Sequence, residues 1–199
     1  MTKTPELIVL CGLPGAGKST YAKQYVKTHP NTKVLSSDGI RNELYGDESI
    51  QGDPAEVFGL MKSRAVEYLN QGSDVIYDAT GMMRMHRGEI LACAPAFAVK
   101  KCVILWASIE ECVKRDSKRN RKVGKEIIDM LVKTFEIPTC EEGFAEIQVI
   151  VPEGFDREAY EKHYVQTEKE IQGQPKAENI LNWMHYGRKE NLLPFSKNL

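Results

Sequence analysis

The sequence predicts an α/β fold in three layers, with helices covering both faces of a five-stranded parallel sheet. Short apolar runs alternate along the chain with longer segments of helical periodicity, which is the order expected of strand–helix–strand units. The runs are apolar at nearly every position, as in strands that are buried on both faces. The strand candidates are residues 7–11, 33–36, 74–78, 101–106 and 147–151.

The helices are indicated by apolar spacing and by the residues that end them. Residues 54–70 carry apolar side chains near the 3.6-residue period, and Gly72 ends this helix. Gly46 ends the helix before it, and Pro95 follows the helix after it. Ligands of such a sheet gather at the carboxyl ends of its strands. The helix candidates are residues 20–26, 38–45, 54–70, 83–93, 110–119 and 125–135.

The chain length of 199 residues suits one domain with a small appendage. We expect the main domain to span residues 1–155 and residues 156–199 to form a helical C-terminal extension. Packing of this extension on the core is the simpler interpretation, and binding of a partner or a nucleic acid is the alternative. Its aromatic and apolar residues include Tyr160, Tyr164, Ile180, Leu181, Trp183 and Tyr186.

The composition excludes several classes of protein. The formal net charge is −1, so the chain is not a general binder of polyanions. Its five cysteines form no C-x-x-C pair, which favours reduced thiols over disulfides or zinc ligands. No apolar run approaches the ~20 residues of a membrane span, and the first strand candidate follows the N-terminus closely. We therefore expect a cytoplasmic protein with no membrane partner.

The segment after the first strand candidate fits the phosphate-binding loop G-x-x-x-x-G-K-[ST] at every fixed position. A phosphate chain there would meet loop amides and the positive end of the following helix. Lys18 would reach the β- and γ-phosphates, and the Ser19 hydroxyl would hold Mg²⁺. The pattern predicts a P-loop NTPase sandwich that binds nucleotide through Gly12, Leu13, Pro14, Gly15, Ala16, Gly17, Lys18, Ser19 and Thr20.

Asp38 and Arg41 follow the second strand candidate at the carboxyl edge of the sheet. Three positions apart at a helix start, they share one helix face. The carboxylate could accept a hydroxyl proton while the guanidinium binds a phosphate. Alternatively, Asp38 caps the helix and Arg41 lies on the surface.

Asp78 ends the third strand candidate as a Walker B acid does, and such an acid holds Mg²⁺ directly or through water. Thr80 follows at the same edge and Arg84 lies on the next helix, so both are candidate contacts of the substrate. The alternative is an ordinary strand-to-helix turn in which Asp78 and Thr80 serve as caps.

A basic stretch follows the fourth strand candidate, within a predicted lid at about residues 110–135. Arg115 and Arg119 are four apart and are predicted to share a helix face. A cationic helical hairpin over the phosphate loop would exclude water and place an arginine against the transferred phosphoryl group. A solvated basic surface is the alternative. The basic residues are Lys114, Arg115, Lys118, Arg119, Arg121, Lys122 and Lys125.

The succession GLPGAGKST, SSDGIR, YDATG and CVKRDSKRNRKVGKEII resembles P-loop kinases of the 5′-hydroxyl polynucleotide kinase type, over about residues 6–152. The resemblance implies that Asp38 is the general base and that Arg41 contacts the acceptor phosphate. It also implies that Arg115 and Arg119 are lid arginines, with Arg119 at the transferring phosphate. The family often has DATN where this chain has DATG, so Gly81 lacks a side chain that could touch the acceptor.

These observations predict an ATP- and Mg²⁺-dependent kinase whose partner is a nucleic acid with a 5′-hydroxyl end. Lys18, Asp38, Arg41 and Arg119 would be catalytic, Ser19 and Asp78 would hold the metal, and Thr80 and Arg84 would join the substrate contacts. Two alternatives stay open: a kinase of a small-molecule or aminoacyl-tRNA hydroxyl, and a nucleotide-binding module without catalysis. The sequence carries no indication of the oligomeric state.

Overall fold

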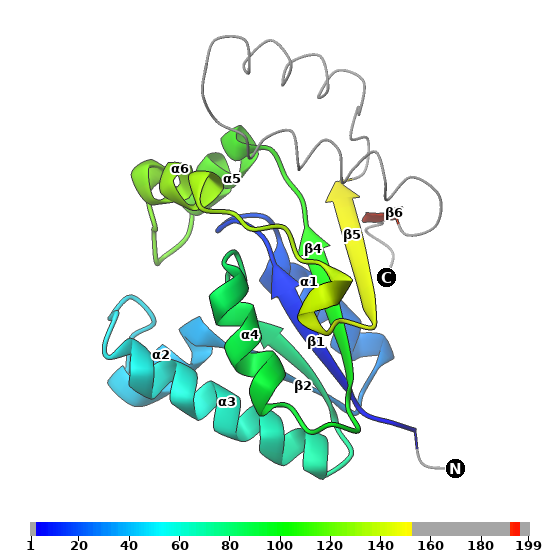
Figure 1. Ribbon diagram of the computed structural model, residues 1–199. Coiled ribbons are helices and arrows are strands. Elements are labelled where there is room, and N and C mark those ends of the chain that lie inside the picture. Colours follow the sequence, from blue (N-terminus) through cyan, green and yellow to red (C-terminus); the bar gives the residue numbers. More distant parts are fainter. Residues whose placement is uncertain (1–2, 153–191, 196–199) are drawn as a thin grey trace.

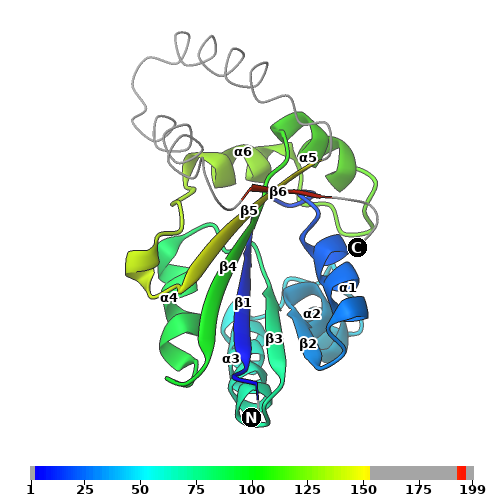
Figure 2. The same cartoon turned by 90° about the vertical axis from the view of Figure 1, so that its right-hand side faces the viewer.

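The computed structural model describes residues 3–152 and 192–195, and its centre is a parallel β-sheet (Figures 1 and 2). The strand order is β2-β3-β1-β4-β5-β6, so the strand that precedes the phosphate-binding loop lies inside the sheet. The strands are β1 (Glu6–Cys11), β2 (Thr32–Ser36), β3 (Asp74–Asp78), β4 (Val99–Leu105), β5 (Glu146–Pro152) and β6 (Leu192–Phe195).

The five strands expected from the sequence are confirmed, and β6 is an addition. It pairs in parallel with β5, from Val149 opposite Leu192 to Pro152 opposite Phe195. The sequence does not predict this strand, because a four-residue segment that contains a proline carries little strand signal. The predicted helices of the C-terminal extension lie outside the described residues.

Six α-helices and one short 3₁₀ helix are described, and most agree with the expected segments. Asp53 caps α3 by accepting a hydrogen bond from the Ala55 amide, and Pro54 occupies the first turn. The helices are α1 (Lys18–Thr28), α2 (Ser37–Tyr45), α3 (Pro54–Asn70), α4 (Arg84–Cys93), α5 (Ile109–Asp116), α6 (Lys125–Lys133) and η1 (Cys140–Glu142).

Helix α5 ends three residues earlier than expected, so the prediction that Arg115 and Arg119 share a helix face is wrong. The buried Asp116 carboxylate, only 2% exposed, accepts hydrogen bonds from the Val123 and Gly124 amides, both at 2.9 Å. These bonds fold the chain after α5 back upon the helix, and Arg119 therefore lies in the turn beyond it.

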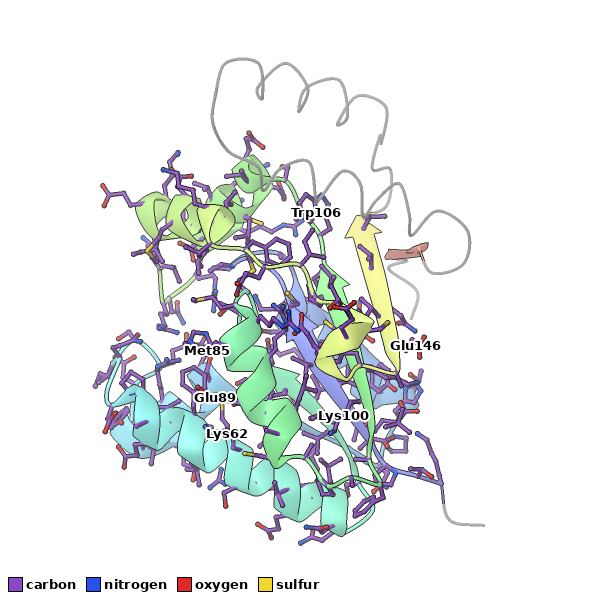
Figure 3. The ribbon with its side chains drawn as sticks, viewed as in Figure 1. Lys62, Met85, Glu89, Lys100, Trp106 and Glu146 are labelled. Carbon is purple, nitrogen blue, oxygen red and sulfur yellow. The ribbon has the colours of Figure 1, made fainter. Side chains whose placement is uncertain are left out.

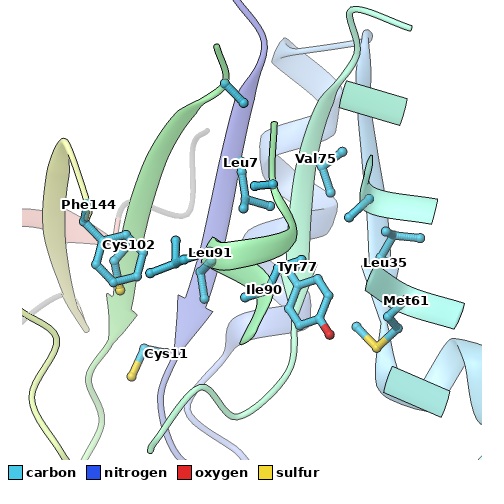
Figure 4. Close-up of a cluster of buried hydrophobic side chains, with 14 of the residues drawn as sticks. Leu7, Cys11, Leu35, Met61, Val75, Tyr77, Ile90, Leu91, Cys102 and Phe144 are labelled. Atoms are coloured by element: carbon cyan, nitrogen blue, oxygen red, sulfur yellow. The ribbon is translucent and has the colours of Figure 1, made fainter. Parts of the chain in front are cut away.

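The two faces of the sheet are covered by different helices, as the sequence predicted. Alternate residues of β1 point to opposite faces. Leu7, Val9 and Cys11 pack with α3 and α4 in the larger core cluster (Figure 4). Ile8 and Leu10 belong to a smaller cluster that includes residues of α1 and α5.

Ion pairs link the helices on the sheet face that carries the larger core cluster. The Arg87 guanidinium of α4 donates two hydrogen bonds to the Glu142 carboxylate of η1, at 2.7 and 2.8 Å, and both side chains are buried. A third donor of Arg87 reaches the Gly81 carbonyl at 2.8 Å. On the surface, Lys62 of α3 pairs with Glu89 of α4 at 2.8 Å (Figure 3). Breaking a buried pair such as Arg87–Glu142 leaves an uncompensated charge, so this contact is structural.

All five cysteines are free thiols, and Cys11, Cys102 and Cys112 are buried. Burial raises the pKa of the Cys112 thiol to about 11, which keeps it protonated at neutral pH. Among the helices of the described residues, none has the length and apolar character that a bilayer span requires.

Candidate active site

The carboxyl ends of the parallel strands open onto one cavity of about 870 Å³. The phosphate-binding loop follows β1, the start of α2 follows β2, and the predicted lid, which comprises α5, α6 and the turn between them, follows β4 (Figure 1). Trp106, at the end of β4, also lines the cavity (Figure 3). The structure thus brings together segments that are far apart in the sequence, at the edge where ligands of such sheets bind.

The phosphate-binding loop is packed tightly between β1 and α5. Gly15 has φ +83°, and a Cβ at this position would lie 2.4 Å from the Cys112 carbonyl oxygen, so α5 can approach only because the residue is glycine. The N-cap of α1 is Gly17, which has no side chain that could satisfy the first amides of the helix. Those amides are therefore suited to an anion.

Lys18 is folded onto its own loop. Its ammonium group donates hydrogen bonds to the Gly12 and Leu13 carbonyls at 2.8 and 2.9 Å. Burial lowers the pKa of Lys18, and the nearby Asp78 carboxylate opposes this shift. Residues Pro14 to Thr20 line the large cavity, whereas Gly12 and Leu13 line a small apolar pocket of about 60 Å³.

Ser19 and Asp78 form the oxygen pair that could hold a divalent cation. The Ser19 hydroxyl donates to Asp78 Oδ2 at 2.8 Å, and Asp78 is 6% exposed. Burial raises the pKa of Asp78, while Lys18 and the Ser19 hydrogen bond act in the opposite direction. Mg²⁺ prefers hard oxygen ligands and uses only one or two from the protein, so this pair fits the ion.

Asp38 does not cap α2. The Ser36 hydroxyl has this role and accepts a hydrogen bond from the Gly39 amide at 2.9 Å. The Asp38 carboxylate, with 24% of its side chain exposed, instead accepts hydrogen bonds from three guanidinium groups. These come from Arg119 at 2.8 Å, from Arg41 at 3.4 Å and from Arg121. The alternative in which Asp38 serves as a helix cap is thereby removed.

Arg41 is not a surface residue, because only 4% of its side chain is exposed, and it is not among the residues that line the cavity, so its predicted contact with the acceptor phosphate has no support in this geometry. Its Nε donates to the Gln51 carbonyl at 3.3 Å. Arg121 donates to the Gln51 side-chain oxygen at 2.8 Å as well as to Asp38. Arg121 belongs to the basic stretch, but the sequence predicted no site role for it. The turn that directs its side chain toward Asp38 depends on the contacts of Asp116. Gln51, in the loop between α2 and α3, carried no sequence signal.

The other predicted site residues lie in different places. Arg115 pairs with Glu111 at 2.8 Å and donates to the Gly15 carbonyl at 3.3 Å, so it borders the phosphate-binding loop. Thr80 lines the cavity, and its carbonyl accepts from the Gly12 amide at 3.0 Å. Arg84 is exposed and is not among the residues that line the cavity. Its predicted contact with the acceptor therefore has no support in this geometry.

The fold and the loop geometry define a nucleotide-binding protein with the architecture of P-loop kinases. The chain belongs to the AAA domain family, which it matches over residues 7–138. It is 25% identical over 150 residues to the L-seryl-tRNA(Sec) kinase of Methanococcus maripaludis. That alignment covers 66% of this chain, which spans about half (53%) of the length of that relative.

Solved structures share the fold at low sequence identity. A chain of the Pnkp1/Rnl/Hen1 RNA repair complex superposes with a TM-score of 0.58 at 17% identity, covering 100% of this chain and 81% of the other. A fungal RNA kinase superposes with a TM-score of 0.54 at 10% identity, covering 96% of this chain and 100% of the other. A gluconokinase from Sinorhizobium meliloti superposes with a TM-score of 0.51 at 13% identity, covering 94% of this chain and 99% of the other. At these identities the similarity shows the fold alone.

Proposed function

We propose that this protein is a kinase that transfers the γ-phosphoryl group of ATP to the 5′-hydroxyl of a polynucleotide. The observation that carries the proposal is the cavity itself, in which an aspartate surrounded by arginines shares the lining with a phosphate-binding loop. The RNA repair and RNA kinase structures with the same fold support it.

On the donor side, Lys18 would exchange its bonds to the Gly12 and Leu13 carbonyls for bonds to the β- and γ-phosphates. The first amides of α1 would bind the same phosphate chain. Ser19 and Asp78 would hold Mg²⁺, which would neutralise phosphate charge. Arg115, beside Gly15, would contribute positive charge at the rim of this site.

On the acceptor side, Asp38 would accept the proton of the alcohol as the alcohol oxygen attacks the γ-phosphorus. The bond from the γ-phosphorus to the bridging oxygen would break, and ADP would leave. Arg119, which donates a hydrogen bond to Asp38 at 2.8 Å, would neutralise negative charge on the transferred phosphoryl group. Most of the rate enhancement would come from positioning and charge neutralisation, since phosphoryl transfer leaves the protein little covalent chemistry.

A second candidate keeps the reaction and changes the acceptor to a small metabolite or an aminoacylated tRNA. The similarity to the seryl-tRNA kinase favours it. Salt dependence separates only the small-metabolite acceptor from the other two, because an oligonucleotide or a tRNA held through several phosphates loses affinity steeply as salt rises and a small neutral acceptor does not.

A transfer assay tests the proposal directly. ATP labelled in the γ-phosphate is incubated with the protein, Mg²⁺ and a panel of 5′-hydroxyl oligonucleotides, aminoacylated tRNAs and small hydroxyl metabolites. We expect label at the oligonucleotide 5′ end. Label on a metabolite or a tRNA alone would support the second candidate. Label that ends only as free phosphate, or stays on ATP, would favour a nucleotide-binding module without acceptor chemistry.

A further inference from the structure

The two oxygens of the Asp38 carboxylate have different partners. Oδ1 accepts hydrogen bonds from Arg41, at 3.4 Å, and from Arg121. Oδ2 accepts one from Arg119 at 2.8 Å, and no other group of the described residues donates to this atom. A carboxylate has about four lone-pair positions on its two oxygens. Both positions of Oδ1 are therefore occupied, whereas Oδ2 keeps one for a further donor.

The partners of the two oxygens also differ in burial. Arg41 is buried and does not line the cavity, and the side chain of Arg121 is 19% exposed. The side chain of Arg119 is 35% exposed and lines the cavity. Oδ1 is thus held from the more buried side of the site. The open position on Oδ2 belongs to the side where Asp38 meets the cavity.

Gln51 holds both partners of Oδ1 from outside the cavity lining. Its backbone carbonyl accepts from Arg41 Nε at 3.3 Å, and its side-chain oxygen accepts from Arg121 Nη2 at 2.8 Å. Arg121 uses its other terminal nitrogen, Nη1, for Asp38. Because a guanidinium is planar and rigid, two bonds from different nitrogens fix its plane. The contact with Gln51 therefore fixes the direction from which Arg121 reaches Oδ1.

Resting on the proposed function, we propose that Arg121 is a positioning residue of the general base. It holds Asp38 through Oδ1 and so keeps the open lone pair of Oδ2 for the proton of the acceptor hydroxyl. Oδ2 takes this proton as the alcohol oxygen bonds to the γ-phosphorus and the bond to the bridging oxygen of ADP breaks. Gln51 supports Arg121 in this role. A base that is oriented in advance needs no rearrangement during the reaction.

A double-mutant cycle tests whether Arg121 acts through Asp38. The single-turnover rate of γ-phosphoryl transfer is measured at saturating ATP, Mg²⁺ and acceptor, with the acceptor that takes label best in the transfer assay. The four proteins are the wild type, Arg121→Ala, Asp38→Asn and the double variant. We expect Arg121→Ala to slow transfer by about 10–100-fold when Asp38 is present. In the Asp38→Asn background the same change should cost less than about threefold, because no base is left to orient.

Two further variants separate orientation from charge. Arg121→Lys keeps the charge but lacks the planar fork, so it should recover less than about a third of the lost rate. Gln51→Ala removes the side-chain bond to Arg121 and keeps the backbone carbonyl that holds Arg41, so it should slow transfer less than Arg121→Ala does. The Kd of ATP, by calorimetry, should stay within about threefold of the wild type in all of these variants, since none loses a bond to a phosphate.

Lys122→Ala is the matched control for the loss of a charge. Lys122 is the exposed neighbour of Arg121 and is not among the residues that line the cavity. This variant should keep the wild-type rate of transfer.

Three results would overturn the inference. Arg121→Ala could slow transfer equally with and without the Asp38 carboxylate, it could weaken ATP binding by tenfold or more, or Arg121→Lys could restore the full rate. These results would give Arg121 a role in the fold, at the donor phosphates, or as a charge alone, and would leave Asp38 as the base. A wild-type rate in Asp38→Asn would instead refute the base of the proposed function, and absence of label on every acceptor would refute the kinase activity itself.

Discussion

Gly81 follows Thr80 after the end of β3 and lies against the backbone of β1. It has φ +57°, and a Cβ built there would lie 2.5 Å from the Leu10 carbonyl oxygen. A side chain at this position would therefore meet β1, and Gly81 is not among the residues that line the cavity. The sequence suggested that a missing side chain at Gly81 removes a contact with the acceptor, and the structure gives the glycine a packing reason instead.

Gly81→Ala should destabilise the protein by about 1–3 kcal/mol, because it combines positive φ with a backbone clash. Thermal unfolding measures the change. Gly88→Ala is the control, since Gly88 lies within α4 and a Cβ there meets nothing within 4 Å. That substitution should stabilise by about 0.5–1 kcal/mol through helix propensity. Equal Tm shifts in the two variants would contradict this account of Gly81.

The buried Asp78 carboxylate should lower the free energy of unfolding at neutral pH, although the proposed reaction needs it to hold Mg²⁺. Burial raises its pKa above the ordinary value of 3.8, so the folded protein holds the proton more tightly than the unfolded chain does. The contribution of Asp78 to stability therefore falls as pH rises from 3.8 through the folded pKa. We expect Asp78→Asn to have a higher Tm than the wild type at pH 7, where about 1 kcal/mol corresponds to roughly 2–4 °C.

The Tm advantage of Asp78→Asn should vanish below pH 3.8, where both states of the wild type are protonated. The Mg²⁺-dependent transfer activity of Asp78→Asn should be lower than that of the wild type at neutral pH, because the amide is a poorer ligand for Mg²⁺ than the carboxylate. An Asp78→Asn variant that is less stable than the wild type at pH 7 would show that the Ser19 and Lys18 contacts outweigh the cost of burying the charge.

Sequence motifs identified residues whose chemistry depends on local spacing. The pairing of Ser19 with Asp78 followed from a loop pattern and the end of a strand, and the two groups lie 2.8 Å apart. Arg121 and Gln51 could not be found in this way. Their contact joins segments 70 residues apart, Gln51 belongs to no motif, and Arg121 is one of several similar basic residues in its stretch.

At the level of elements, the lid depends on one buried carboxylate. Asp116 ends α5 and accepts from the Val123 and Gly124 amides, and the turn that these bonds close carries Arg119 and Arg121. The sequence predicted the bounds of α3 well, because its cap and first-turn proline are local signals. It extended α5 too far, because the bonds that fold the chain back after Asp116 join residues seven and eight positions apart.

Asp116→Ala should release this turn. We expect kcat/KM for phosphoryl transfer to fall by about 10- to 100-fold, since small displacements of catalytic groups have effects of this size. Stability should fall by about 1–3 kcal/mol as the two amides lose their acceptor. Both are measured on the same preparation by the transfer assay and by thermal unfolding.

Asp129→Ala is the control for the lid, because Asp129 is an exposed residue of α6 that pairs with the exposed Lys125. Exposed pairs contribute less than about 1 kcal/mol, so this variant should resemble the wild type. If Asp116→Ala kept full activity, the turn would not be what positions the lid arginines.

At the scale of the whole molecule, the parallel sheet is what brings the candidate site together. Lys18 lies beyond the end of β1, Asp38 lies just after β2, and Asp78 is the last residue of β3; these three strands are neighbours in the sheet. This convergence could be predicted, because parallel strands place their carboxyl ends at one edge. The strand β6 could not, since it pairs with β5 from a distant part of the chain and has little strand character of its own.

Charge is distributed unevenly over the same architecture. The chain as a whole has a formal net charge of −1, yet the cavity has an excess of basic side chains. An anionic ligand would therefore be attracted by the local charge of the cavity rather than by the overall field of the protein. In this account the lid supplies charge, and the sheet edge supplies the base and the phosphate-binding loop.

The most direct measurement of the central claim is the single-turnover rate of γ-phosphoryl transfer by Asp38→Asn at saturating ATP, Mg²⁺ and acceptor. With Asp38 as the general base, the rate should fall by about 10²–10⁴-fold. The Kd of ATP, measured by calorimetry, should change little, because the hydrogen bonds of Asp38 go to arginines outside the phosphate-binding loop. A rate equal to that of the wild type would contradict the assignment of Asp38 and with it the mechanism proposed for this cavity.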